Sequence, residues 1–196
     1  MATFAGASCE AVCLTFFVAY VAPAAWTASA AAAFTLLSGA VAFAGAGHGK
    51  TEAGEPGKAA DVTKTIEVVM YDNYYEPESI TVKEGETVRF IVKNAGELVH
   101  EFNIGTAQML IDHAPEMEMM VEHGVLEADK INHDVAKQMQ ESMGHGAHEM
   151  ANAALLEPGK TGEIIWKFPK HAELEFGCTV PGHYDAGMVG EFSLTH

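Results

Sequence analysis

The most informative feature of the sequence is a group of sulfur and imidazole donors near its C-terminal end. Cys178, His183 and Met188 follow one another at intervals of five residues in the run GCTVPGHYDAGMVG. A second histidine, His100, lies upstream in the strand-like stretch LVHEFNIG. One thiolate, two imidazoles and a thioether are the donors of a type 1 copper site, with a planar His2Cys set and a weak axial methionine. The sequence therefore predicts copper as a cofactor, bound by these four residues.

Each of these residues also has an ordinary structural explanation when it is taken alone. His100 could be a hydrogen-bonded core histidine, Met188 could pack in the core, and Cys178 could be a buried, inert thiol. Zinc is the main rival metal, because it binds cysteine and histidine but has little use for a thioether. The combination of all four donors favours copper.

The chemistry of such a site is one-electron transfer. Cu(I) prefers sulfur and Cu(II) prefers imidazole nitrogen, so a site that offers both can hold either state with little rearrangement. We also expect each imidazole to be oriented through its second ring nitrogen by a neighbouring group.

Alternating apolar residues predict the strands that position these donors. The alternation has a period of two over residues 63–106 and again over 161–196, as short β-strands require. His100, Cys178 and Met188 each fall in phase with the apolar residues of their own strand, and should therefore point inward. Short alternating strands with turns between them favour an all-β sandwich or Greek-key barrel.

A segment rich in methionine and histidine, residues 107–157, interrupts the β pattern. It contains seven of the ten methionines and five of the ten histidines. Pro115 suits the first position of a helix near 115–123. Asn132 is a candidate N-cap for a second helix, which would end near Gly144. The sequence therefore predicts a partly helical insertion.

The insertion is a candidate site for additional copper. Methionine and histidine residues three or four apart share a helix face, and loose arrays of thioether and imidazole suit weak, exchangeable Cu(I) binding. The alternative is that these methionines fill gaps against the barrel. The candidate secondary ligands are Met117, Met120, His123, Met143, His145, His148 and Met150.

The N-terminal region predicts export. Residues 11–44 are almost wholly apolar and end in an Ala-x-Ala pattern at Ala44, which is typical of a signal-peptide cleavage site. We therefore interpret residues 1–44 as a signal peptide. A retained membrane anchor is the alternative, because an apolar stretch of more than about 18 residues can span a bilayer.

The rest of the chain divides into a linker and a domain. Residues 45–62 are rich in Gly, Ala, Lys and Glu without periodicity and predict a flexible linker, followed by a domain over 63–196. Cys9 and Cys13 lie in the leader, so the exported domain would carry Cys178 as its single thiol. A metal bond is one reason for a thiol to stay unpaired in a compartment that favours disulfides.

Composition and motif content limit the possible partners and reactions. The formal net charge of −16 argues against nucleic-acid binding, which needs a basic face. It suits contact with cations or basic partners, although solubility explains it equally well. The chain has no His-x-His pair of the kind a multicopper oxidase needs, and the exported domain lacks the two nearby cysteines of a dinuclear copper centre. We therefore do not expect catalysis of either sort.

The stretches VKNAGELVHEFNIG and EFGCTVPGHYDAGMVGEFSL resemble the cupredoxins, and most closely the periplasmic copper-resistance cuproproteins of the CopI type. The resemblance covers roughly residues 60–196 and includes the methionine- and histidine-rich insertion. It implies a Greek-key β-barrel, a periplasmic location and a role in copper tolerance, with His100, Cys178, His183 and Met188 as the metal ligands. A plain electron-transfer cupredoxin that serves a respiratory or oxidase partner is the alternative.

The sequence departs from the cupredoxin pattern at one position. Many electron-carrier cupredoxins have asparagine directly after the first histidine ligand, where it ties the two ligand loops together; this chain has Glu101 there. We expect a monomer that binds copper ions, with a redox protein as a candidate partner and no membrane contact after signal cleavage.

Overall fold

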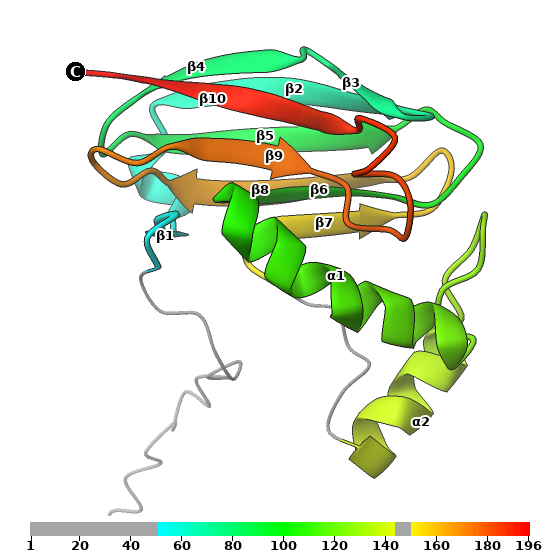
Figure 1. The fold of residues 1–196 in the computed structure, drawn as a ribbon. Helices are drawn as coiled ribbons and strands as arrows, with labels where there is room; N and C mark the ends of the chain where they lie inside the picture. The colour runs from blue at the N-terminus through cyan, green and yellow to red at the C-terminus, as the bar shows by residue number, and fades with distance from the viewer. Residues whose placement is uncertain (1–50, 144–149) are drawn as a thin grey trace, which may run out of the picture. The chain divides into compact units, whose positions relative to one another are not determined.

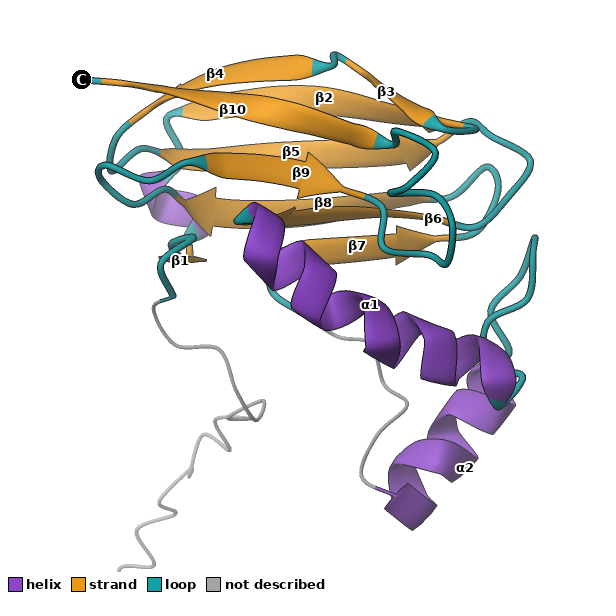
Figure 2. Cartoon of the chain, viewed as in Figure 1, coloured by secondary structure: helices purple, strands orange, loops and turns teal. Residues whose placement is uncertain are grey.

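The computed structural model describes residues 51–143 and 150–196, and their strands form two five-stranded sheets (Figures 1 and 2). The leader interpreted from residues 1–44, and the first part of the expected linker, lie outside the described residues. Among the residues that are described, no helix combines the length and apolar character needed to cross a membrane.

The first sheet has the strand order β1-β8-β5-β2-β3. Its strands are β1 (Glu55–Pro56), β2 (Lys64–Tyr71), β3 (Tyr74–Glu76), β5 (Thr87–Asn94) and β8 (Thr161–Lys167). β2 and β5 pair in parallel, and the other pairs are antiparallel. A parallel pair needs a crossover connection, and here the chain makes it by passing through the other sheet as β4 (Ser79–Lys83).

The second sheet has the order β4-β10-β9-β6-β7. Besides β4 it contains β6 (His100–Gly105), β7 (Ala153–Leu156), β9 (Leu174–Gly177) and β10 (Val189–Thr195). β6 and β9 are antiparallel neighbours, with Asn103 opposite Gly177. Because β6 begins at His100 and β9 ends one residue before Cys178, this pairing brings two of the predicted metal ligands to the same end of the sheet.

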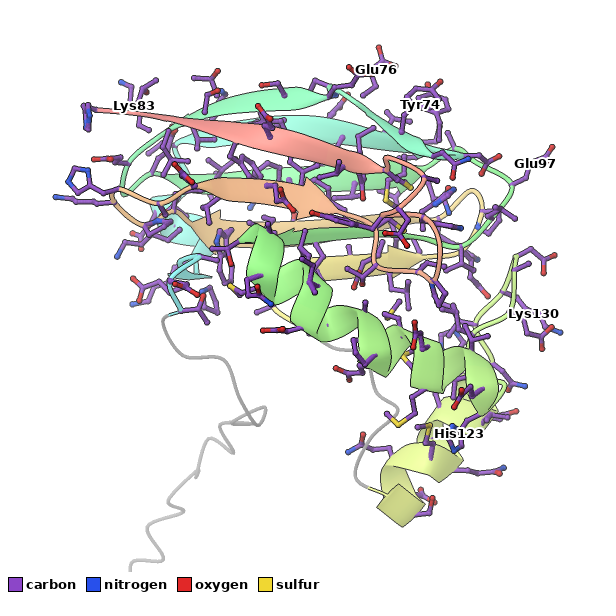
Figure 3. The ribbon with its side chains drawn as sticks, viewed as in Figure 1. Tyr74, Glu76, Lys83, Glu97, His123 and Lys130 are labelled. Carbon is purple, nitrogen blue, oxygen red and sulfur yellow. The ribbon has the colours of Figure 1, made fainter. Side chains whose placement is uncertain are left out.

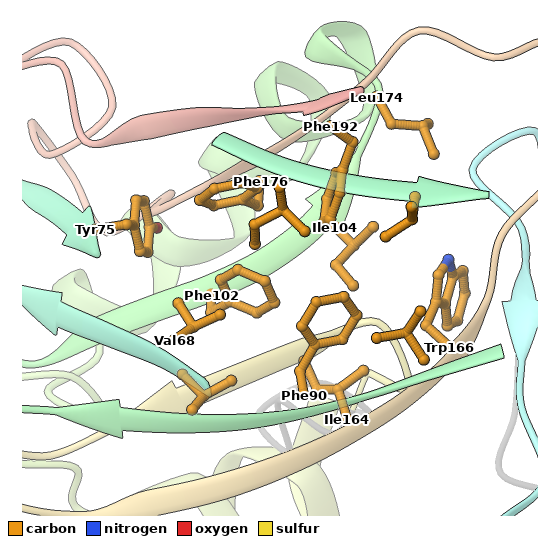
Figure 4. Close-up of a cluster of buried hydrophobic side chains, with 14 of the residues drawn as sticks. Val68, Tyr75, Phe90, Phe102, Ile104, Ile164, Trp166, Leu174, Phe176 and Phe192 are labelled. Atoms are coloured by element: carbon orange, nitrogen blue, oxygen red, sulfur yellow. The ribbon is translucent and has the colours of Figure 1, made fainter. Parts of the chain in front are cut away.

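Aromatic side chains fill the space between the sheets (Figure 4). The ring of Phe90 on β5 lies 5.5 Å from that of Phe102 on β6 and 6.0 Å from that of Phe192 on β10, measured between centroids. Phe102 and Phe176 approach within 5.1 Å. Tilted and edge-on aromatic pairs at such distances add to the free energy gained from burying the rings. The predicted all-β sandwich is confirmed.

Residues 51–62 differ from the expected flexible linker. β1 pairs with β8, the short helix η1 (Ala59–Asp61) follows, and Ala53 is completely buried. The indole Nε1 of Trp166 donates a 2.9 Å hydrogen bond to the Ala53 carbonyl. A strand of two residues is too short to show an alternating pattern in the sequence. Its extended conformation is held by its pairing with β8.

The insertion contains two helices in its described part. The predicted start is wrong for the first helix and correct for the second. α1 (Ala107–Glu122) begins well before the expected 115–123, because Thr106 caps it by accepting a 3.3 Å hydrogen bond from the Met109 amide. Pro115 therefore lies inside the helix rather than at its first position. α2 (His133–Met143) starts where expected, with Asn132 Oδ1 accepting from the Val135 amide at 3.2 Å.

The insertion is also shorter than the range 107–157. Residues Ala153–Leu156 form β7, which pairs with β6 and sets Leu156 opposite His100. This strand belongs to the sandwich, so the chain returns to the sheet before the methionine-rich segment was expected to end.

Candidate metal centre

Two elements bring the predicted ligands together. His100 opens β6, while Cys178, His183 and Met188 lie on the loop between β9 and β10. The loop folds back on itself: the His183 amide donates to the Val180 carbonyl at 2.9 Å, and the Met188 amide donates to the His183 carbonyl at 3.0 Å. Gly182 has a φ of +85°, a conformation that glycine adopts without strain, so the loop can turn tightly beside His183.

Three donor atoms form a triangle. Cys178 Sγ lies 3.3 Å from His183 Nδ1 and 4.0 Å from His100 Nδ1, and the two Nδ1 atoms are 3.2 Å apart. Atoms with these separations can all contact one ion, because metal bonds to imidazole nitrogen and thiolate sulfur are about 2.0–2.3 Å long. The same three residues form one of the potential metal-binding groups in the described part of the chain.

The triangle lies just below the surface. His100, Cys178 and Met188 are completely buried, which confirms that all three point inward. His183 is half-buried and therefore connects the group to solvent. Burial and the neighbouring His100 both lower the pKa of His183, so its ring is neutral at neutral pH, as metal binding requires.

Met188 is tied to the triangle through its backbone. Its carbonyl accepts a 3.1 Å hydrogen bond from the Cys178 amide, and its own amide donates to the His183 carbonyl. The methionine is therefore held directly beside two of the three residues whose donor atoms meet.

Asp72 holds the imidazole of His100 from behind. His100 Nε2 lies 2.9 Å from Asp72 Oδ1, which leaves Nδ1 facing Cys178 and His183. The backbone amide of Glu97 donates to the same carboxylate oxygen at 3.0 Å, and the hydrogen bond to His100 lowers the pKa of Asp72. The expected orienting partner exists for His100, but its identity was not apparent from the sequence, because Asp72 lies in the turn between β2 and β3.

Glu101 connects the two ligand-bearing segments. Its backbone amide donates a 3.3 Å hydrogen bond to Cys178 Sγ. Its side chain is completely buried and accepts hydrogen bonds from both the hydroxyl and the amide of Thr179, at 2.5 Å and 3.3 Å. The carboxylate thus ties the two segments together, the role that asparagine has in many electron-carrier cupredoxins.

His113 extends this network into the insertion. Its Nε2 lies 3.5 Å from Glu101 Oε1, and its Nδ1 lies 3.3 Å from Glu116 Oε2. Burial lowers the pKa of His113, but the two carboxylates outweigh that effect and raise it above its ordinary value. When it is protonated, His113 therefore compensates part of the buried charge of Glu101. Nothing in the sequence pattern distinguishes His113 from the other histidines of the insertion.

The donor set and the state of the thiol fit a bound metal. Burial raises the pKa of Cys178 to about 12, so without a metal the sulfur keeps its proton. A soft metal ion replaces that proton when it binds, since thiolate rather than thiol is the ligand. One sulfur and two imidazole nitrogens are the donors expected for a type 1 copper site.

In the described part of the chain, the candidate secondary ligands Met117 and Met120 lie together in an apolar cluster, and His123 belongs to neither group of metal-binding side chains. Met117 and Met120 are buried in an apolar cluster with Val99, Val125 and Leu126, which supports the packing alternative for both. His123 is exposed at the end of α1 (Figure 3), and its Nδ1 lies 2.9 Å from the Met119 carbonyl oxygen. Met150 is half-buried, and Met143 is the last residue of α2. His145 and His148 lie outside the described residues.

Comparison with known proteins identifies the relatives of this chain. The family model for the cupredoxin-like domain matches residues 21–126. A Pseudomonas aeruginosa protein named copper-resistant cuproprotein CopI is 44% identical over 169 residues, which are 81% of this chain and 91% of that protein. A protein of the same name from Rubrivivax gelatinosus is 39% identical over 142 residues, 72% of each chain. Dithionite-reduced auracyanin from Roseiflexus castenholzii matches with a TM-score of 0.49 and 22% identity, over 69% of this chain and 99% of that one.

The two-sheet sandwich, with a Cys-His-His group at one end, defines a protein of the cupredoxin class. The chain belongs to the cupredoxins and, within them, to the CopI-type cuproproteins.

Proposed function

We propose that this protein is an exported copper protein that contributes to copper tolerance and holds one copper ion through His100, Cys178, His183 and Met188. The observation that carries the proposal is the triangle of Cys178 Sγ and the two Nδ1 atoms. The names of the relatives, which are copper-resistant cuproproteins, support the link to tolerance.

The surrounding residues support a site of constant geometry. Bound copper supplies one-electron redox chemistry. Asp72 fixes the ring of His100, and Glu101 ties the Cys178 segment to β6. A protein that prevents its ligands from moving lets copper change its oxidation state with little rearrangement.

We assign the protein to the periplasm, with residues 1–44 as the removed leader. The apolar leader with its Ala-x-Ala pattern supports this location. So does the single thiol of the remaining chain, which a copper bond would protect from oxidation.

Extra copper binding by the insertion remains part of the proposal, but the buried Met117 and Met120 contribute less to it than His123 and the segment 143–150. A triple replacement of His123, His145 and His148 by alanine should lower the total copper bound per chain and leave the thiolate-bound ion in place. Unchanged copper stoichiometry in this variant would contradict the role of the insertion.

A second candidate function is electron transfer to a respiratory or oxidase partner. The half-buried His183 favours it, because an imidazole that reaches the surface offers a short route for an electron. Fast, salt-dependent electron exchange with a basic partner, together with normal copper resistance in a strain lacking the gene, would favour this function over tolerance.

The deciding experiment is a spectrum with a metal count. Purified full-length protein is loaded with Cu(II), its visible absorption is recorded, and copper is measured per chain. We expect an intense thiolate-to-copper charge-transfer band and one tightly held ion that accounts for it. A strain lacking the gene should also be more sensitive to copper. A colourless, copper-loaded protein would overturn the proposed site, and unchanged copper sensitivity would overturn the role in tolerance.

A further inference from the structure

A second group of metal-binding side chains lies away from Cys178. Glu84 follows β4, His171 follows β8, and His196 follows β10. One donor atom from each lies within 4.8 Å of the others. β10 begins directly after Met188 and ends directly before His196, so the two groups lie at opposite ends of this strand (Figure 1). A strand of seven residues is on the order of 20 Å long.

The Glu84 carboxylate stands between the two imidazoles. Its Oε1 lies 3.1 Å from His171 Nδ1, and its Oε2 lies 3.2 Å from His196 Nδ1. Neighbouring donors around a metal with bonds of about 2.0–2.2 Å are roughly 3 Å apart. The two N–O separations therefore match the edges of a coordination sphere, and an ion could bind after small side-chain rotations.

The backbone holds this arrangement in place. The Glu84 amide donates to the Thr195 carbonyl at 2.9 Å, which connects the Glu84 turn to the residue before His196. The His171 amide donates to Glu84 Oε1 at 2.9 Å. His171 also has a φ of +55°, a conformation that is unfavourable for a non-glycine residue and recurs where ligands are clamped.

The charges and the exposure of the group suit a cation. The Glu84 side chain is only 11% exposed, whereas both imidazoles are open to solvent. An ion can therefore reach the two imidazoles from solvent, while the Glu84 carboxylate between them is already held in place. The hydrogen bond from the His171 amide lowers the pKa of Glu84, which keeps its charge at neutral pH.

We propose that Glu84, His171 and His196 form a second metal site that binds Cu(II) independently of the site at Cys178. Two imidazoles and a carboxylate, without sulfur, are a donor set for Cu(II) rather than Cu(I). Among divalent ions, the general order of affinity for nitrogen and oxygen donors places copper above zinc. The chain would thus hold the oxidised ion at one end of the sandwich and a redox-active ion at the other.

The test titrates Cu(II) into full-length protein that already carries one copper per chain. Electron paramagnetic resonance separates thiolate-bound copper from copper bound by nitrogen and oxygen alone, and calorimetry measures affinity. The test variant is His171→Ala with His196→Ala, and Glu84→Gln removes only the central charge. His133→Ala, which removes an exposed histidine on α2, is the matched control.

We expect the wild type and the control to bind one more Cu(II) ion per chain through nitrogen and oxygen than the double variant does, with the thiolate band unchanged in all three. Losing one orienting partner of a ligand typically costs 10–100-fold in metal affinity, so losing both imidazoles should raise the Kd for Cu(II) at least ~100-fold. Equal Cu(II) affinity in the wild type and the double variant would overturn the site. Tighter binding of Zn(II) than of Cu(II) would overturn the choice of metal. Because the thiolate band is read separately, failure here is distinguishable from failure of the site at Cys178.

Discussion

The buried carboxylate of Glu101 accepts two hydrogen bonds from Thr179, one from its hydroxyl and one from its amide. The two residues directly follow His100 and Cys178, so this contact joins the segments that carry these two donors of the candidate metal centre. On its other side the same carboxylate faces His113 of α1. The insertion is thereby connected to the metal centre by charge as well as by packing.

Removing the Glu101 carboxylate should destabilise the fold strongly. Glu101→Ala removes the charged acceptor of the buried Thr179 and one of the two carboxylates beside His113, and breaking a buried ion pair on one side typically costs about 3–5 kcal/mol. Urea denaturation of metal-free protein measures the free energy of unfolding. Glu118→Ala, at an exposed position on α1, is the control and should change it by less than about 0.5 kcal/mol. Similar effects of the two substitutions would contradict the structural role of Glu101.

The ion pair of His113 should make stability depend on pH. The pKa of His113 is higher in the folded protein than its ordinary value of 6.5, so its stabilising effect is complete below pH 6.5 and disappears as pH rises through the folded-state pKa. The difference in unfolding free energy between wild type and His113→Asn should therefore be larger at pH 5.5 than at pH 9, by about 1.4 kcal/mol per unit of pKa shift. Titratable groups that do not interact with His113 cancel in this difference. A difference that stays constant with pH would show that the imidazole does not gain a proton on folding.

Replacing the thiol should abolish the thiolate band. Cys178→Ser removes the sulfur, and serine oxygen gives no such transition, so copper-loaded protein should lose the intense visible absorption completely. His133→Ala, far from the triangle in the chain, should keep it. An intense band that survives in Cys178→Ser would mean that this sulfur is not the copper ligand.

Asp72 should affect copper retention without being a ligand. Asp72→Ala removes the acceptor at His100 Nε2, and loss of such a partner typically lowers metal affinity 10–100-fold. Competition with a chelator for the copper that gives the thiolate band measures this effect. Asp129→Ala, which also removes an exposed carboxylate, should leave the affinity unchanged. Equal copper retention in the two variants would exclude an orienting role for Asp72.

Met117 should act through packing rather than through copper binding. It is completely buried in the apolar cluster beneath the insertion, so Met117→Ala should cost about 2–5 kcal/mol, whereas Met117→Leu keeps the volume and should cost less than about 1.5 kcal/mol. Copper per chain should be the same in wild type and Met117→Leu. A lower copper content in the leucine variant would mean that the thioether binds copper despite its burial.

The sequence alone determined which faces of the strands point inward and which donors share a loop. Strand side chains alternate with a period of two, so the apolar phase of each strand already predicted that His100, Cys178 and Met188 would be buried. The Cys-x4-His-x4-Met spacing places three donors on one short loop whatever the rest of the fold does. These features are local, and local sequence encodes them.

Only the tertiary structure decided which distant groups complete these sites. Asp72 is 28 residues from His100, Glu101 is 78 from Thr179, and Glu84 is 112 from His196. Such contacts depend on strand order and register, which the packing of both sheets determines together and which no single strand's pattern records. For the same reason the sequence pattern indicates neither β1 nor β7, because a short strand acquires its structure from the strand beside it.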